Sequence, residues 1–171
     1  MKAKSGFTLV EILIVVVILG ILAAIVIPQF AGASQEAKES ALMSDLQAMR
    51  SQIELYKIQH NDLLPGEEGT GPLDPALVAT DSTRFENALM SKTNQQGQIG
   101  TDAEHRFGPY MRAVPSNPFV DTNADVVEVD GTVGGGDNGW HLITTAGVNR
   151  GLFQADDDGL NAVTGEAHTS Y

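Results

Sequence analysis

The sequence has no cysteine and few basic residues, and each shortage excludes a class of protein. Without cysteine, the chain forms no disulfide and offers no thiol nucleophile. Only 10 lysines and arginines stand against 22 aspartates and glutamates, which gives a formal net charge of −12. Because such an acidic chain repels phosphates, we expect no nucleic acid to bind the isolated chain.

Familiar catalytic motifs are also missing. The histidines, His60, His105, His141 and His168, form no HExxH motif and show no paired metal-ligand spacing. The sequence contains no GxSxG, P-loop or GxGxxG motif, and the glycine-rich stretch at 131–139 has no lysine to hold a phosphate. We therefore predict a protein that is not an enzyme and that requires no cofactor.

Polar side chains are almost absent from residues 7–28, where Thr8 and Glu11 are the two exceptions. As a helix this run is about 33 Å long, enough to cross the hydrocarbon core of a bilayer. Lys2 and Lys4 precede the run, so the N-terminal end should lie in the cytoplasm and the body of the chain outside. The pattern predicts a single membrane-spanning helix.

The position of Glu11 argues against a disposable secretory signal. A carboxylate in an apolar segment costs a few kcal/mol, which a segment destined for removal has no reason to bear. The run is also longer than the apolar part of a signal peptide. Ala31-Gly32-Ala33 nevertheless has the form of a signal-peptidase site, so cleavage after Ala33 stays an alternative.

The string Lys4-Ser5-Gly6-Phe7-Thr8-Leu9-Val10-Glu11 resembles the processing site of type IV pilins and type II secretion pseudopilins. In that family a membrane peptidase removes a short basic leader after a glycine and N-methylates the new first residue. The resemblance implies that residues 1–6 are a leader, that cleavage falls between Gly6 and Phe7, and that Phe7 is methylated. Pro28 matches a proline that the family commonly carries near the end of its apolar half.

The same resemblance implies a role for Glu11 in assembly. Cleavage creates an amine at Phe7, and in a filament the Glu11 carboxylate of one subunit pairs with the Phe7 amine of a neighbour. A buried charge is tolerated when it is paired, so an unpaired Glu11 would penalise a subunit that docks out of register. In the isolated membrane-held subunit we expect Glu11 to extend towards the lipid headgroups.

The family further implies a location and a set of partners. The subunit would sit in the bacterial inner membrane with its C-terminal domain in the periplasm, and would enter a periplasmic or extracellular filament. Its partners would be further copies of itself, other pilins or pseudopilins, the prepilin peptidase, the inner-membrane assembly platform and, before assembly, membrane lipid.

The lack of cysteine favours one function within this family, because many adhesive pilins close a C-terminal loop with a disulfide. We predict a structural subunit of a type II secretion pseudopilus, which helps to drive protein export. Two alternatives stay open. One is a type IV pilin that forms an extracellular pilus for adhesion, motility or DNA uptake, and the other is a membrane-anchored binding protein with a false pilin signal.

Residues 29–60 predict an amphipathic continuation of the apolar helix. Their apolar side chains recur every three or four positions, at Leu42, Leu46, Met49, Ile53 and Tyr56. We expect one helix from about residue 7 to about 60, ended by Asn61-Asp62 and Pro65-Gly66. Gly20 and Pro28 are the positions where it would bend.

The rest of the chain predicts an α+β pilin fold, in which the long helix packs on a small antiparallel sheet. Residues 61–112 form a loop region with a short helix at about 82–92, capped by Asp81 or Ser82. Residues 113–171 form the sheet and acidic C-terminal loops, with strands at about 125–130, 139–145 and 150–154. The residues expected to face inward are Phe85, Leu89, Met90, Trp140, Leu142 and Ile143.

Residues 107–119 are rich in proline and are expected to pack apolar side chains onto the long helix. These side chains are Tyr110, Met111, Val114 and Phe119. The segment also resembles one in the major pseudopilins, where an aromatic stretch leads to a proline and then to an Asn/Asp-Pro-aromatic turn. Pro115 and Asn117-Pro118-Phe119 occupy those places.

Two acidic loops make calcium a candidate ligand. Asp121, Asn123 and Asp125 have spacing that can direct oxygens at calcium, although Val126 stands where an EF-hand has glycine. The second group is Asp156, Asp157, Asp158 and Asn161. The resemblance adds that major pseudopilins bind calcium in C-terminal loops, without a motif match that carries the site over. A solvated acidic surface is the alternative for each loop.

Overall fold

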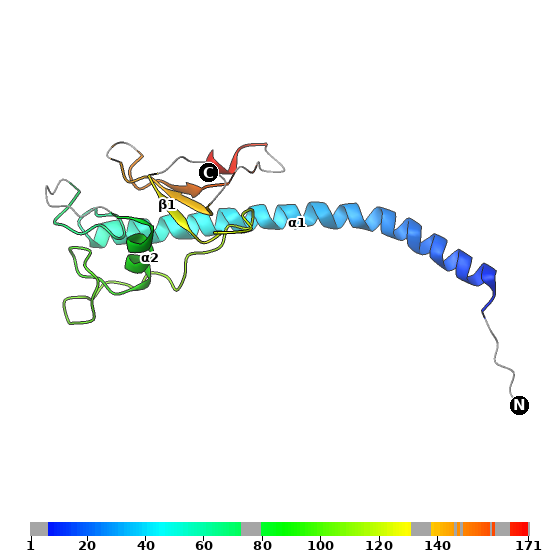
Figure 1. Ribbon diagram of the computed structural model, residues 1–171, viewed down its shortest axis with the longest axis horizontal. Coiled ribbons are helices and arrows are strands. Elements are labelled where there is room, and N and C mark those ends of the chain that lie inside the picture. The colour runs from blue at the N-terminus through cyan, green and yellow to red at the C-terminus, as the bar shows by residue number, and fades with distance from the viewer. Residues whose placement is uncertain are drawn as a thin grey trace, which may run out of the picture. The chain divides into compact units, whose positions relative to one another are not determined.

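The structure is a computed structural model. It describes residues 7–72, 80–130, 138–145, 147, 149–157, 159 and 165–170. Along the chain these residues form two α-helices, three strands and a short 3₁₀ helix (Figure 1). The elements are α1 (Leu9–Gln59), α2 (Ser82–Met90), β1 (Val127–Val129), β2 (Trp140–Leu142), β3 (Phe153–Ala155) and η1 (His168–Ser170).

The chain divides into two units, Met1–Ala37 and Lys38–Tyr171, and α1 belongs to both. The apolar part of α1 has an 18-residue window with a mean hydropathy of 3.3, none of it buried. By length and composition, α1 is the one helix among the described residues that can cross a membrane. Gly20 and Pro28 both lie inside α1, and the helix is unbroken at each, so a bend there stays a prediction.

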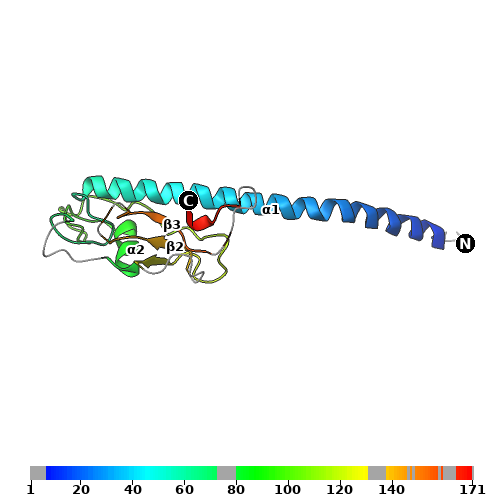
Figure 2. The same cartoon turned by 90° about the horizontal axis from the view of Figure 1, so that it is seen from above.

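The predicted apolar stripe forms the core of the second unit. Its five side chains are each at most 1% exposed: Leu42, Leu46, Met49, Ile53 and Tyr56. The strands and α2 supply the side chains that cover this stripe, and Figures 1 and 2 show them beside the same part of α1. The amphipathic half of α1 is therefore the element on which the rest of this unit packs.

The short helix α2 is capped as its sequence predicts. Asp81 accepts a hydrogen bond of 2.9 Å from the backbone N–H of Arg84, which satisfies one of the free donors of the first turn. Phe85 and Leu89 are buried, as predicted, but Met90 is partly exposed. Phe85, Ala88 and Leu89 share one helix face, whereas Met90 comes about 100° after Leu89 and leaves that face.

The sheet has the strand order β1-β2-β3, and the prediction of an entirely antiparallel sheet is wrong. β2 and β3 are antiparallel, but β1 and β2 are parallel. The connection between β1 and β2, from residue 130 to residue 139, is longer than the roughly two to five residues of a usual hairpin loop, so the sequence did not require an antiparallel pair here.

Alternation along the strands decides which side chains enter the core. Trp140 and Leu142 are fully buried against the helix, as predicted. Ile143 is only partly buried and lies outside this core cluster, because the residue after Leu142 points to the opposite side of the strand. The strands are also shorter than predicted, with three residues in each.

The segment 107–119 packs as predicted. Val114 belongs to the buried core, and Tyr110, Met111 and Phe119 pack against it. The indole N–H of Trp140 donates a hydrogen bond of 2.7 Å to the carbonyl of Pro115, which fixes this segment to β2.

The end of α1 is held by a buried histidine. His60 Nδ1 lies 2.8 Å from the Tyr56 carbonyl oxygen, and Nε2 lies 2.8 Å from the Thr93 hydroxyl. A neutral imidazole satisfies both contacts, because one ring nitrogen donates to the carbonyl and the other accepts from the hydroxyl. Burial lowers the pKa of His60.

The lowered pKa of His60 predicts that acid destabilises the second unit. The unfolded chain, with a histidine pKa of about 6.5, binds the proton before the folded chain does. The contribution of His60 is therefore complete above about pH 6.5 and is lost as the pH falls towards the folded-state pKa. His60→Gln should reduce the pH dependence of the unfolding free energy below about pH 7, by up to about 1.4 kcal/mol per pH unit.

Urea denaturation of both proteins at a series of pH values measures this slope. The two slopes should coincide above about pH 7.5, where the histidine is neutral in both states. Equal slopes at lower pH as well would contradict a buried, neutral His60.

Candidate functional site

The first turn of α1 is closed by reciprocal hydrogen bonds between Thr8 and Glu11. The backbone N–H and the hydroxyl of Thr8 donate to the same Glu11 carboxylate oxygen, at 2.8 and 2.9 Å. The Glu11 N–H donates to the Thr8 hydroxyl oxygen at 3.3 Å. Thr8 precedes Leu9, the first helical residue, so the pair forms a capping box.

This geometry gives Glu11 a partner within its own chain. A carboxylate in the first turn also interacts favourably with the positive end of the helix dipole. The capping box was not predicted, although the order Thr-x-x-Glu before an apolar run is its signature. Phe7, the expected processed terminus, is 84% exposed, and Gly6 lies outside the described residues.

The first acidic loop lies at the surface of the second unit. Asp121, Asn123 and Asp125 are all exposed. Asn123 adopts a left-handed conformation (φ 57°), and its carbonyl accepts hydrogen bonds from the N–H groups of Val126 and Gly139 at 3.0 and 2.9 Å. Among the described residues, one group of histidine and acidic side chains converges well enough to hold a metal ion, and neither Asp121 nor Asp125 belongs to it.

The second acidic loop is only partly described, because Asp158 and Asn161 lie outside the described residues. Asp157 is buried and both its oxygens are engaged. One accepts from the Gly159 N–H at 2.8 Å and lies 2.6 Å from His168 Nδ1, and the other accepts from the Asn117 side chain at 2.8 Å. Asp157 is therefore a poor fit to a calcium ligand, because both its oxygens already serve internal contacts.

A buried histidine joins this loop to α1. His168 is fully buried in η1, with Nδ1 facing Asp157 and Nε2 lying 3.1 Å from Glu39 Oε1. The Phe119 ring stands 4.3 Å from the imidazole, centroid to centroid. Glu39 and His168 are 129 residues apart in sequence, which is why no local spacing revealed the contact. The cluster fastens the described C-terminal segment to the long helix.

Removal of Glu39 should therefore destabilise the second unit. Glu39→Ala removes the hydrogen-bonding partner of Nε2 of the fully buried His168, and the loss of one partner of a buried polar group typically costs about 1–3 kcal/mol. Glu36→Ala is the matched control, since Glu36 is an exposed acid on the same helix and its removal should cost less than about 0.5 kcal/mol. Urea denaturation measures both values, and equal values would contradict a stabilising role for this cluster.

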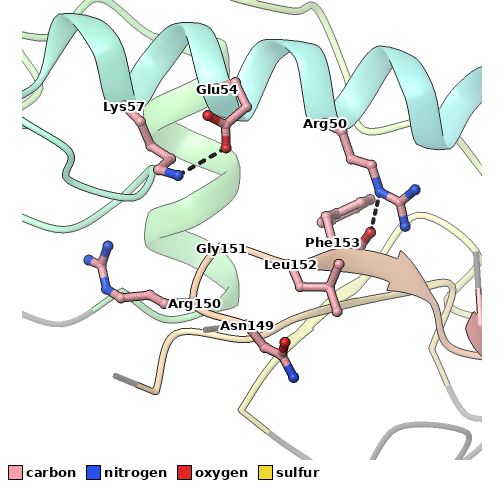
Figure 3. A pocket seen from close by; sticks show the side chains of 8 residues that line it. All are labelled: Arg50, Glu54, Lys57, Asn149, Arg150, Gly151, Leu152 and Phe153. Carbon is pink, nitrogen blue, oxygen red and sulfur yellow. Dashed lines mark hydrogen bonds and ion pairs between the residues drawn. The ribbon is translucent and has the colours of Figure 1, made fainter. Parts of the chain in front are cut away.

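A pocket of about 410 Å³ lies between α1 and the segment that leads into β3 (Figure 3). Its ionic side chains serve internal contacts. Arg50 Nε donates to the Phe153 carbonyl at 2.8 Å, and Lys57 Nζ lies 2.9 Å from Glu54. Arg150 pairs with Glu67. The residues that line the pocket include no histidine, serine or cysteine.

Comparisons with known proteins find a match for the N-terminal segment and relatives that cover most of the chain. Residues 1–27 match the family model of the prokaryotic N-terminal methylation motif. Relatives over most of the chain are proteins named type II secretion system core protein G. The relative from Klebsiella pneumoniae is 36% identical over 119 residues, which cover 70% of this chain and 71% of the relative.

The relative from Pseudomonas aeruginosa is 30% identical over 137 residues, which cover 80% of this chain and 92% of the relative. The relative from Aeromonas hydrophila is 29% identical over 118 residues, which cover 69% of each chain. No solved structure matches the chain.

Proposed function

Because the chain belongs to the family of type II secretion system core protein G, we propose that it is a structural subunit of the type II secretion pseudopilus. The observation that carries this function is the similarity to core protein G over 80% of the chain, together with the methylation motif at its N-terminus. The relatives favour neither an extracellular type IV pilus nor a binding protein with a false pilin signal. They are named as secretion components, which agrees with a structural role.

The subunit is first processed by proteolysis. The prepilin peptidase removes residues 1–6 by cleavage between Gly6 and Phe7, and the new Phe7 amine is methylated. The match of residues 1–27 to the methylation motif supports this assignment. Cleavage also removes Lys2 and Lys4, which changes the net charge from −12 to −14 and leaves a single positive amine immediately before the capping box.

Mass spectrometry and N-terminal sequencing of the chain test this step in a bacterium that carries a type II secretion system. The native chain should begin at N-methyl-Phe7. Gly6→Leu should retain the leader, because a side chain at the cleavage site obstructs the peptidase. Gly20→Ala is the matched control and should be processed normally, since a methyl group at Gly20 contacts nothing within 4 Å. A chain that begins at Ser34 or an uncut Met1 would contradict the proposal.

The second step is transfer from the membrane into the filament. The exposed apolar side chains of α1, such as Val15, Ile18 and Leu22, face lipid before assembly and neighbouring helices afterwards. The assembly platform of the inner membrane delivers the subunit, and other pseudopilins take part in the filament. The acidic second unit lies in the periplasm and forms the outer layer of the filament.

Glu11 fixes the register of this packing. In the single chain the Glu11 carboxylate accepts hydrogen bonds from Thr8, which supports the same arrangement in the subunit stored in the membrane. In the filament we propose that the carboxylate pairs with the Phe7 amine of a neighbouring subunit. A subunit docked one step away would bury Glu11 without a cation, which typically costs several kcal/mol. This cost in free energy favours one axial position of the incoming subunit over the positions one step away.

Substitution of Glu11 separates its charge from its role in the cap. Glu11→Gln keeps a side chain that can complete a capping box but removes the charge. If the charge sets the register, Glu11→Gln and Glu11→Ala should each insert into the membrane and lower the yield of filaments by roughly tenfold or more. Thr8→Val is the control, because it weakens the cap and keeps the charge.

The yield of filaments sheared from cells, relative to subunit in the membrane, measures the effect. Thr8→Val should assemble within about twofold of the native chain if the cap contributes the usual ~1 kcal/mol or less to the filament. Normal assembly of Glu11→Gln would contradict the pairing.

Calcium is the cation that we propose for the acidic loops, as an accessory and not as a required cofactor. Supporting it are the exposed carboxylates of Asp121 and Asp125, and the sequence of the second loop at 156–161. The engaged oxygens of Asp157 count against that residue as a direct ligand.

A further inference from the structure

The face of the sheet that points away from the core is polar, and most of it is buried. Val127, Trp140 and Phe153 belong to the core face, so by alternation the next residue of each strand points the other way. Those residues are Glu128, His141 and Gln154, and they are direct neighbours in the strand register. Asp156 continues this face beyond β3, where its N–H donates to the Gly139 carbonyl at 3.1 Å.

Three of these side chains converge. Glu128, His141 and Asp156 each offer one ligand atom, and the three atoms lie within 4.8 Å of one another. His141 is 1% exposed and Asp156 is 0% exposed, whereas Glu128 is partly exposed. The Nδ1 atom of His141 is buried and has no hydrogen-bond partner among the residues that the structure describes. A buried polar nitrogen without a partner is costly and therefore points to a missing ligand.

We propose that Glu128, His141 and Asp156 form a binding site for a divalent metal ion of the first transition row, and we expect that ion to be zinc. One imidazole and two carboxylates are ligands that zinc accepts in proteins, and they leave a fourth position for water. The metal occupies the polar face and gives the buried Nδ1 atom of His141 a partner.

The geometry requires little movement. A tetrahedral zinc with bonds of about 2.1 Å holds its ligand atoms about 3.4 Å apart, so the widest separation must close by at most about 1.4 Å. Glu128 is partly exposed and accepts one hydrogen bond of 3.3 Å, from Asn138, so its side chain has room to make this adjustment.

The imidazole distinguishes this site from the acidic loops. Calcium prefers six to eight oxygen ligands, whereas imidazole nitrogen suits zinc and its neighbours in the first transition row. The site draws one ligand from β1, one from β2 and one from the end of β3, so the ion links three strands of three residues each. Its existence does not depend on the secretion role proposed above.

Titration of the full chain in detergent with zinc chloride tests the site, after treatment with a chelator. A chromophoric zinc competitor measures affinity and stoichiometry, and thermal unfolding measures the consequence for stability. We expect one high-affinity zinc per chain. The unfolding midpoint should rise by roughly 5–10 °C when free zinc is about 100 times the dissociation constant.

Glu128→Gln is the decisive variant because Glu128 is only partly buried and glutamine preserves its shape. It should weaken zinc binding by at least about tenfold and remove most of the thermal shift. Glu104→Gln is the matched control, since Glu104 is an exposed acid outside the cluster. His105→Gln controls for adventitious binding at a partly accessible histidine. Both controls should bind zinc as the native chain does.

A parallel titration with calcium chloride completes the test. If Glu128→Gln does not change calcium binding, we would assign that calcium to the acidic loops. The zinc titration alone would then decide the zinc site. No zinc bound by the native chain, or the same zinc affinity in Glu128→Gln as in the native chain, would overturn the proposal. A thermal shift caused by calcium and lost in Glu128→Gln would show an oxygen-ligand cation site and overturn the assignment of the metal.

Discussion

The carboxylate of Glu11 constrains every other use of the N-terminal helix, because it is an ionised group in the first turn of an otherwise apolar segment. In the single chain Thr8 accommodates it through a capping box, which also starts the helix. The cap consists of hydrogen bonds and does not itself supply a cation for the negative charge. An apolar filament core makes that charge costly, so the cation that compensates it determines where a subunit fits. Proteolysis at Gly6 would supply this cation in the form of the Phe7 amine.

The second unit obeys a different constraint. The apolar stripe on α1 needs a cover, and α2, the sheet and segment 107–119 provide it. The sheet is too short to be secured by its ladder alone, with three residues in each strand. Buried polar contacts at its margins add specific connections. His168 joins Glu39 to Asp157, and Asn117 binds the same aspartate. This unit therefore lacks disulfides but gains cross-links from ionic and hydrogen-bonded side chains.

Local sequence patterns predicted correctly those parts of the fold in which the burial of a helix face or the cap of a helix depends on one segment alone. The stripe from Leu42 to Tyr56 and the cap at Asp81 are local signals, and the structure confirms both. Strand direction was predicted wrongly, because it depends on where the connection at 130–139 returns the chain. The contacts of His168 and the convergence of Glu128, His141 and Asp156 were not predictable, since their members come from separate elements. The capping box at Thr8 was predictable from its spacing and was overlooked because Glu11 was assigned only an intermolecular partner.

The role of Glu11 in setting the register is tested most directly by a cryo-electron microscopy map of the assembled filament that resolves the first turn of α1. An ion pair that sets the register predicts that the Glu11 carboxylate of each subunit lies within about 4 Å of the Phe7 amine of a neighbour. It also predicts that this contact repeats at every axial step. A map in which Glu11 bonds only to Thr8 of its own chain, with the neighbouring amine elsewhere, would contradict the claim that this charge sets the register.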